Sequence, residues 1–224
     1  MSQLTLVIGN KNYSSWSLRP WILLRHNGVA FSEVHIPLSR PDTADLLRPH
    51  SPTLKVPVLN DASLTVWDSL AICEYVSEQY LAGKGWPQAV AARAQARSFA
   101  AEMHSGFQAL RSAWPMNVRL QRKLPVDAAV QRDIDRVCDI WESCLAKSGG
   151  PWLYGEFGIV DAMFAPVALR FHSYQPDLPA RAQAYVQTHV NNPALREWID
   201  AGRAETDVIR EDEVGYLLGE PGWD

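Results

Sequence analysis

The chain has 224 residues, a formal net charge of −4 and a pI near 5.9, with 47% hydrophobic and 21% charged residues. This composition is typical of a globular protein with a sizeable core, and the charge gives no electrostatic reason to expect nucleic acid or an acidic membrane as a partner. No apolar run approaches the roughly 20 residues that span a bilayer, and the N-terminal MSQLTLVIGN lacks the features of a signal peptide. We therefore expect a cytoplasmic protein.

The three cysteines and six histidines show no metal-ligand spacing. Cys73, Cys138 and Cys144 form no CxxC pair, and an odd number of unpatterned cysteines is typical of a reducing compartment. We expect no metal site and three packing cysteines.

The first 82 residues combine strand and helix patterns. Short apolar or alternating runs predict strands, and apolar residues at helical spacing predict helices. In chain order these are a strand at Leu4–Gly9, a helix at Leu18–Asn27, strands at Glu33–Leu38, Val56–Asn60 and Leu64–Trp67, and a helix at Ser69–Tyr80. The order is β-α-β, a longer connection, then β-β-α.

A Gly/Pro-containing segment at 83–88 is the best linker in the chain, and strand patterns vanish after it. Five stretches then carry helical spacing: Ala89–Trp114, Val126–Lys147, Ile159–Tyr174, Pro179–Asn191 and Pro193–Arg203. Ile159–Tyr174 is unusually apolar, so we expect it to be buried. The sequence thus predicts an α/β domain at 1–82, a linker at 83–88 and an all-helical domain at 89–224.

Hydroxyl groups gather between the first predicted strand and the first predicted helix, at Tyr13, Ser14, Ser15 and Ser17. Proline lacks an N–H and fits the first turn of a helix, so Pro20 predicts a helix that begins close to Ser17. Ser14 and Ser15 would then lie in the loop or at its edge. A hydroxyl there either caps the helix or donates to an anionic ligand, and these residues alone leave both roles open.

Two further segments are ambiguous on their own. Val56-Pro57 opens a predicted strand, where proline marks an edge or a special bend. Asp68-Ser69 precedes a helix that either residue can cap. In a binding role, the Val56 backbone would pair with a ligand, and Asp68 and Ser69 would hold one that carries both an ammonium and a carboxylate.

Taken together, the segments Ser14–Arg19, Val56-Pro57, Asp68–Val76 and Phe157–Ala162, in this order of strands and helices, resemble the glutathione S-transferase superfamily. The resemblance runs the whole chain. It implies a two-domain glutathione transferase fold, with a thioredoxin-like α+β N-terminal domain and an all-α C-terminal domain.

The resemblance also implies residue roles, with glutathione as cosubstrate and no metal. Val56, with Pro57 in the cis form, would pair with the cysteinyl residue of glutathione, and Lys55 would reach its glycyl carboxylate. Asp68 and Ser69 would hold its γ-glutamyl end. Ser14 would hydrogen-bond the sulfur and activate the thiol, with Tyr13 as the alternative activator.

The Ser-Ser-x-Ser arrangement looks most like the zeta class, whose motif reads Ser-Ser-Cys and whose members isomerise maleylacetoacetate and act on small α-haloacids. Trp16 stands where that class has its cysteine. The leading hypothesis is therefore a serine-type glutathione transferase of detoxification. The alternatives are a zeta-like maleylacetoacetate isomerase, a glutathione-dependent dehalogenase, and a noncatalytic interaction module that uses the same fold.

The electrophile would bind between Ser14 and the first long helix of the second domain, and Trp16, His104, Phe107 and Arg111 are the candidate pocket residues. In the stretch that carries the last three of them, the spacing of residues 103, 107, 110 and 114 is also that of plain core packing. Gly158 stands where the family's capping box has Ser or Thr, and we expect this departure to affect stability. The family further implies a homodimer.

Overall fold

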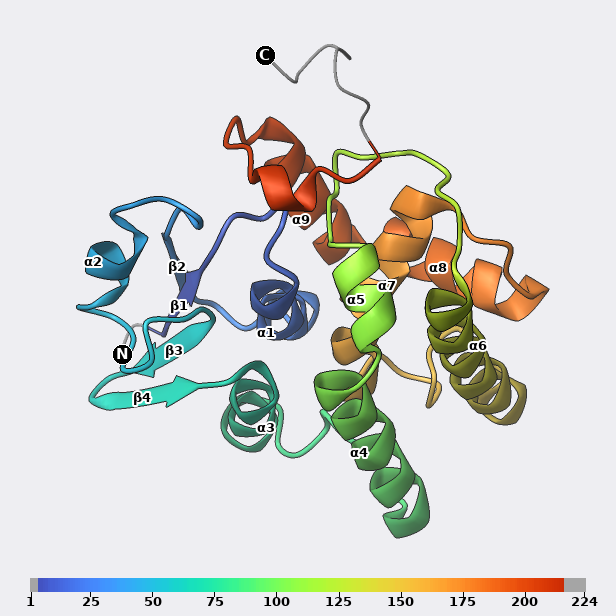
Figure 1. The fold of residues 1–224 in the computed structure, drawn as a ribbon. Helices are drawn as coiled ribbons and strands as arrows, with labels where there is room; N and C mark the ends of the chain where they lie inside the picture. Colours follow the sequence, from blue (N-terminus) through green and yellow to red (C-terminus); the bar gives the residue numbers. More distant parts are fainter. Residues whose placement is uncertain (1–3, 216–224) are drawn as a thin grey trace.

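The computed structural model describes residues 4–215, in which a small sheet with its helices lies beside a larger helical part (Figure 1). The strands are β1 (Thr5–Ile8), β2 (Ser32–His35), β3 (Val58–Asp61) and β4 (Leu64–Trp67). They form a sheet of order β2-β1-β3-β4, in which β1 and β2 are parallel and the other neighbours antiparallel. This arrangement and the helical part that follows confirm the predicted thioredoxin-like domain and glutathione transferase fold.

The two faces of the sheet have different covers, because successive side chains of a strand point to opposite faces. Leu6 and Ile8 of β1 join the main core with α1 (Ser15–His26) and α3 (Ser69–Tyr80). Val7 packs in a small second cluster with Leu47 of α2 (Thr43–Leu47). The helix α2 lies in the longer connection, where no element was predicted.

The helical part consists of α4 (Val90–Ser105), α5 (Gln108–Ala113), α6 (Ala128–Ser148), α7 (Ile159–Tyr174), α8 (Ala180–Asn191) and α9 (Pro193–Ala204), followed by a 3-10 turn at Arg210–Asp212. Nearly every residue of α7 is buried, as its apolar sequence predicted, and α7 contacts α1, α4 and α8. The main core therefore continues from the sheet into the helical part without a break.

Two predicted helix boundaries are wrong. The stretch Ala89–Trp114 is not one helix, because Gly106 is extended and Phe107 has a φ of 56°, which ends α4 and starts α5. The first helix begins at Ser15 and not near Ser17, with Ser14 as its N-cap, so Pro20 lies inside it. Proline at that position cannot donate the helical hydrogen bond to Trp16, and the helix continues regardless.

The segment predicted as a linker is packed against both parts of the chain. The Gly85 N–H donates to Ser77 Oγ at 3.1 Å, and the Gly85 carbonyl accepts from Ile159 N at 2.9 Å. The Trp86 side chain is buried and donates to Glu74 at 2.7 Å. The connection is thus held by α3 on one side and the start of α7 on the other.

Candidate functional site

The hydroxyl cluster at the start of α1 forms a buried hydrogen-bond chain. Ser14 Oγ donates to Ser17 Oγ at 2.7 Å and accepts from the Ser17 N–H at 3.4 Å. Ser17 Oγ also accepts from the Gly9 N–H at 3.1 Å. Ser14 therefore caps the helix, and its hydroxyl lies where the partial positive charge of the helix N-terminus favours an anion.

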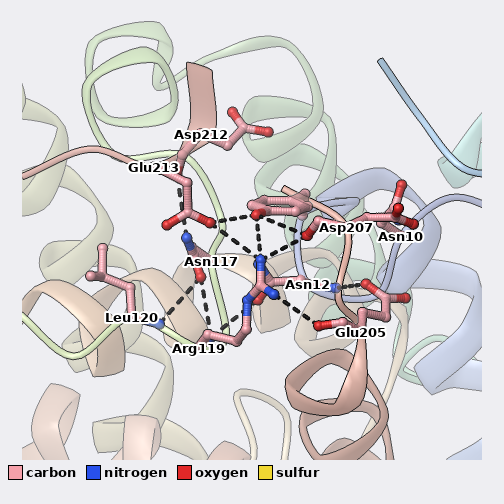
Figure 2. Close-up of polar contacts among 10 residues, drawn as sticks. Asn10, Asn12, Asn117, Arg119, Leu120, Glu205, Asp207, Asp212 and Glu213 are labelled. Atoms are coloured by element: carbon pink, nitrogen blue, oxygen red, sulfur yellow. Dashed lines mark hydrogen bonds and ion pairs between the residues drawn. The ribbon is translucent and has the colours of Figure 1, made fainter. Parts of the chain in front are cut away.

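Tyr13 points instead toward the C-terminal segment. Its hydroxyl donates to the Glu213 carboxylate and accepts from Arg119. Burial, followed by the hydrogen bond to Glu213, raises the pKa of Tyr13 to about 12. Figure 2 shows that Arg119 also bonds the carbonyl groups of Glu205 and Asp207, at 2.8 and 2.9 Å. The Tyr13 hydroxyl is thus occupied by a network that ties residues 205–213 to the loop before α1.

One cavity of about 460 Å³, called here the Asp68 cavity, brings most of the predicted binding residues together. The Val56–Pro57 peptide bond is cis, as the resemblance implies. Lys55 and Asp68 supply one cation and one anion to the wall. The cavity is lined by Trp16, Thr53, Lys55, Val56, Pro57, Trp67 and Asp68.

Asp68 combines a structural and an exposed role at the start of α3. It has a φ of 74°, and its Oδ1 accepts from the N–H groups of Leu70 and Ala71 at 2.9 and 3.3 Å. Its Oδ2 lies 3.1 Å from His104 Nε2, while the side chain stays 44% exposed. Asp68 thus caps the helix while its partly exposed carboxylate lines the cavity.

A second cavity of about 240 Å³ is also lined by Trp16 and is called here the arginine cavity. Trp16 lines both cavities and so forms their shared wall. Most of the other lining residues are polar. The arginine cavity is lined by Tyr13, Ser15, Trp16, Gln108, Arg111, Pro115, Met116, Arg170 and Asp212.

Three cationic or aromatic groups contact the Trp16 ring. The guanidinium carbons of Arg19 and Arg111 lie 4.3 and 4.7 Å from its centroid, and the His104 ring packs edge-on at 5.2 Å. Burial lowers the pKa of Arg19 to about 9, with the Arg111 charge as the second cause. Burial also lowers the pKa of His104, against the Asp68 charge, which raises it.

Some predicted residues do not line either cavity. Ser14 and Ser69 are buried behind the walls, where Ser69 Oγ accepts from Arg19 at 3.4 Å. His104 reaches the walls through Trp16 and Asp68. Phe107 belongs to the hydrophobic core, because the turn at positive φ between α4 and α5 carries its ring inward.

Sequence reasoning missed four residues of these walls and their surroundings. Arg19 belongs to the segment Ser14–Arg19, and Trp67 directly precedes Asp68, so the sequence motifs already pointed to both residues. Arg170 is the single charged residue after Asp161 in an apolar helix, which is itself a signal of function. Asp212 gave no signal, because only the path of the C-terminal segment brings it to the arginine cavity.

Within residues 4–215, no group of three or more His, Cys, Asp or Glu side chains is arranged to hold a metal ion. No helix in the same range is both long and apolar enough to cross a bilayer.

Comparison with family models identifies both parts of the chain. The model of the glutathione S-transferase N-terminal domain matches residues 13–79, and that of the glutathione S-transferase C-terminal domain matches residues 88–201. A search of curated proteins gave no significant match.

Solved structures with a similar fold are numerous and distant in sequence. A glutathione transferase homologue from Burkholderia GL BGR1, with bound glutathione, is 22% identical, with a TM-score of 0.69 over 91% of this chain and 100% of that chain. The theta class glutathione S-transferase of Xanthomonas axonopodis pv. citri, with glutathione bound, is 22% identical, with a TM-score of 0.64 over 89% and 98%. Glutathione transferase Omega 2S of Trametes versicolor, in complex with 2,4-dihydroxybenzophenone, is 20% identical, with a TM-score of 0.70 over 90% and 95%.

Proposed function

The chain belongs to the glutathione S-transferase family, and we propose that it binds glutathione in the Asp68 cavity and activates its thiol through Ser14 for attack on a small electrophile. The observation that carries this proposal is that Lys55, Val56 and Asp68 meet in one cavity beside the Trp16 wall. Two of the solved structures with this fold hold glutathione.

The charges of the Asp68 cavity suit the ends of a γ-glutamyl tripeptide. The Asp68 carboxylate would accept from the γ-glutamyl ammonium, and the buried Ser69 hydroxyl and the start of α3 would favour the neighbouring carboxylate. Lys55 supplies a cation for the glycyl carboxylate. Between these ends, the backbone of Val56 would pair with the cysteinyl residue.

Ser14 has the chemistry that thiol activation requires. A free thiol has a pKa near 8.5, and lowering it by about two units takes roughly 2.7 kcal/mol. A hydroxyl donor to an anion supplies about 1.5–3 kcal/mol and a helix N-terminus about 0.3–1 kcal/mol. Because hydroxyl hydrogens rotate, Ser17 can donate to Ser14 Oγ while Ser14 turns its own proton to the sulfur.

The finer assignments rest on the sequence resemblance. A zeta-like isomerase or a dehalogenase would share every glutathione-binding residue and differ only in the pocket for the second substrate. A noncatalytic module would not need the thiol-activating hydroxyl. A homodimer and a cytoplasmic location remain expectations from the sequence.

The test is an ultraviolet difference titration of bound glutathione against pH. We expect a thiolate band well below the pKa of the free thiol, and Ser14→Ala should raise the apparent pKa by about one to two units, the equivalent of the lost hydrogen bond. Tyr13→Phe should leave it in place, because that hydroxyl is occupied by Glu213 and Arg119.

The opposite pattern, a shift in Tyr13→Phe and none in Ser14→Ala, would assign the activation to Tyr13. A protein that does not bind glutathione at all would favour the interaction module.

A further inference from the structure

Three arginines near Trp16 lack the carboxylate partners that arginines elsewhere in the chain possess. Arg25, Arg119 and Arg136 are paired with Glu197, Glu213 and Glu102. Arg19, Arg111 and Arg170, in contrast, form no ion pair with any carboxylate of residues 4–215. A group of buried or half-buried cations without partners calls for an anion from outside the chain.

Backbone carbonyl groups satisfy these guanidiniums only in part. Arg170 is 4% exposed, and it donates to the carbonyls of Trp114 and Pro166 at 2.7 and 3.2 Å. Arg111 makes only longer contacts, at 3.4 and 3.3 Å, to the carbonyls of His104 and Gly106. Arg19 Nε is buried with no hydrogen-bond partner in the described part of the chain. Arg111 and Arg170, which line the arginine cavity, thus keep N–H donors beyond those that their carbonyl partners accept.

Burial and neighbouring charges both act on the pKa values of these guanidiniums. Burial is the main cause that lowers the pKa of Arg170 to about 10; the Arg111 charge acts in the same direction, whereas Tyr174 and Asp212 act to raise it. For Arg19, burial is again the main cause, the charges of Arg111 and Arg170 also lower the pKa, and Asp68 acts to raise it. A bound anion would offset both the cost of burying the charged guanidiniums and the repulsion between them.

Two of the three arginines line the arginine cavity, and the third does not. Arg19 stacks on the Trp16 ring and donates to Ser69 Oγ. Arg111 and Arg170 line the arginine cavity. The one acidic side chain in that lining is Asp212, and Figure 2 shows its carboxylate apart from the Arg119 network. The cavity therefore carries a net positive charge at neutral pH in a protein whose net charge is −4.

We infer that the electrophile of this enzyme carries a carboxylate or a similar anionic group, which Arg111 and Arg170 hold in the arginine cavity. This inference rests on the proposed function and names the substrate class of the same site. The anionic group serves recognition and takes no part in the reaction. The glutathione sulfur attacks the electrophilic carbon, a C–S bond forms as the bond to the leaving group breaks, and the leaving group departs with the electron pair.

The test uses two probes that differ in one charge, 4-chloro-3,5-dinitrobenzoate and its methyl ester. Rates with glutathione are corrected for the spontaneous reaction of each probe, and the affinity of the protein for the two glutathione conjugates is measured by calorimetry. We expect kcat/KM to be about tenfold or more higher for the acid than for the ester. The protein should also bind the conjugate of the acid about tenfold or more tightly, because a hydrogen bond between charged groups contributes at least this much. Arg111→Gln should remove this preference, because it should lower kcat/KM and conjugate affinity for the acid about tenfold more than for the ester.

Two further variants make the result specific. Arg132→Gln removes the same charge from an exposed position on α6 and should change neither probe. Asp212→Asn removes the one acid of the cavity and should raise the preference for the acid probe several-fold, in the opposite direction to Arg111→Gln.

The outcomes separate the two proposals. Equal handling of acid and ester by a protein that binds glutathione would overturn the inference and leave the proposed function standing. An equal loss with both probes in Arg111→Gln would also overturn it, because Arg111 would then serve the thiolate. If neither glutathione nor the conjugates bind, both the proposed function and the inference fail.

Discussion

Asp161 is a fully buried carboxylate that holds three donors at the start of α7. Its oxygens accept from Leu153 N and Gly158 N at 3.0 Å and from the Tyr185 hydroxyl at 2.7 Å. Burial raises the pKa of Asp161 to about 6, although these hydrogen bonds act to lower it. The carboxylate is therefore both a connector of three segments and a group that binds its proton more tightly in the folded chain.

Asp161→Asn should lower the free energy of unfolding by about 1–3 kcal/mol, because an amide offers one oxygen and leaves at least one donor without an acceptor. Since the folded pKa is raised, the stability that Asp161 contributes is complete below the unfolded value near 3.9 and is lost as pH rises through about 6. Urea unfolding should thus show that the difference in free energy of unfolding between the wild type and the variant decreases from pH 4 to pH 7.

Asp127→Asn is the matched control, since Asp127 caps α6 from an exposed position and asparagine caps a helix equally well. A constant difference between wild type and Asp161→Asn across this pH range would contradict the raised pKa.

For individual residues, the sequence predicted which residues line the Asp68 cavity better than it predicted the directions of their neighbours' side chains. Lys55, Val56, Pro57 and Asp68 do meet in one cavity, because they directly precede β3 and α3, two elements that the sequence predicted. The direction of Phe107 was not predictable, since a left-handed backbone at a phenylalanine has no sequence signature. Arg170 and Asp212 come from distant segments, and only the tertiary fold brings them to one wall.

At the scale of elements, Gly158 explains a departure from the family pattern. A Cβ at this position would lie 2.9 Å from the carbonyl oxygen of Gly85, and that carbonyl accepts from Ile159 N. The segment at 83–88 thus occupies the space that a capping side chain would require. The glycine permits the close approach of the linker to α7.

Gly158→Ser should therefore destabilise the protein by about 1–3 kcal/mol, even though serine is the better helix cap. The clash is with backbone, so the linker or the helix start must move. Chemical denaturation measures the loss, and Gly158→Ala should show the same cost without a new hydroxyl. A serine variant as stable as the wild type would show that capping outweighs the contact.

Helix boundaries were predictable where local and tertiary signals agree. The helices α3 and α7 have the predicted ends, because Asp68 and Asp161 mark their starts. The sequence did not predict the break between α4 and α5. In the structure, a Cβ at Gly106 would lie 2.7 Å from the Glu102 carbonyl oxygen. That glycine is required by a close backbone approach, which helical periodicity does not reveal.

At the scale of the whole molecule, residues 205–213 fasten the helical part to the loop before α1. The Glu205 carboxylate accepts from the backbone N–H of Lys11 at 2.7 Å and of Asn12 at 3.0 Å. Gly202 of α9 lies so close to this loop that a Cβ there would be 3.0 Å from Asn12 N. The loop that carries Tyr13 and Ser14 is thus shaped by contacts from the far end of the described chain.

Glu205→Ala should reduce the free energy of unfolding by about 1–3 kcal/mol, because two part-buried N–H groups lose their acceptors. Hydrogen exchange at Lys11 and Asn12 should accelerate more than exchange in α7. The control is Glu211→Ala, which removes an exposed acid from the same segment. Unchanged exchange at Lys11 and Asn12 would mean that the loop holds its shape without Glu205.

The position of Glu205 also sets an order of events during synthesis. Lys11 is translated 194 residues before the carboxylate that accepts its N–H, and Tyr13 is translated 200 residues before Glu213. A nascent chain that has completed the sheet and α1–α3 already contains Ser14, Lys55 and Asp68, yet its loop before α1 lacks those partners. The loop before α1 therefore acquires these hydrogen bonds only after translation has passed Glu213.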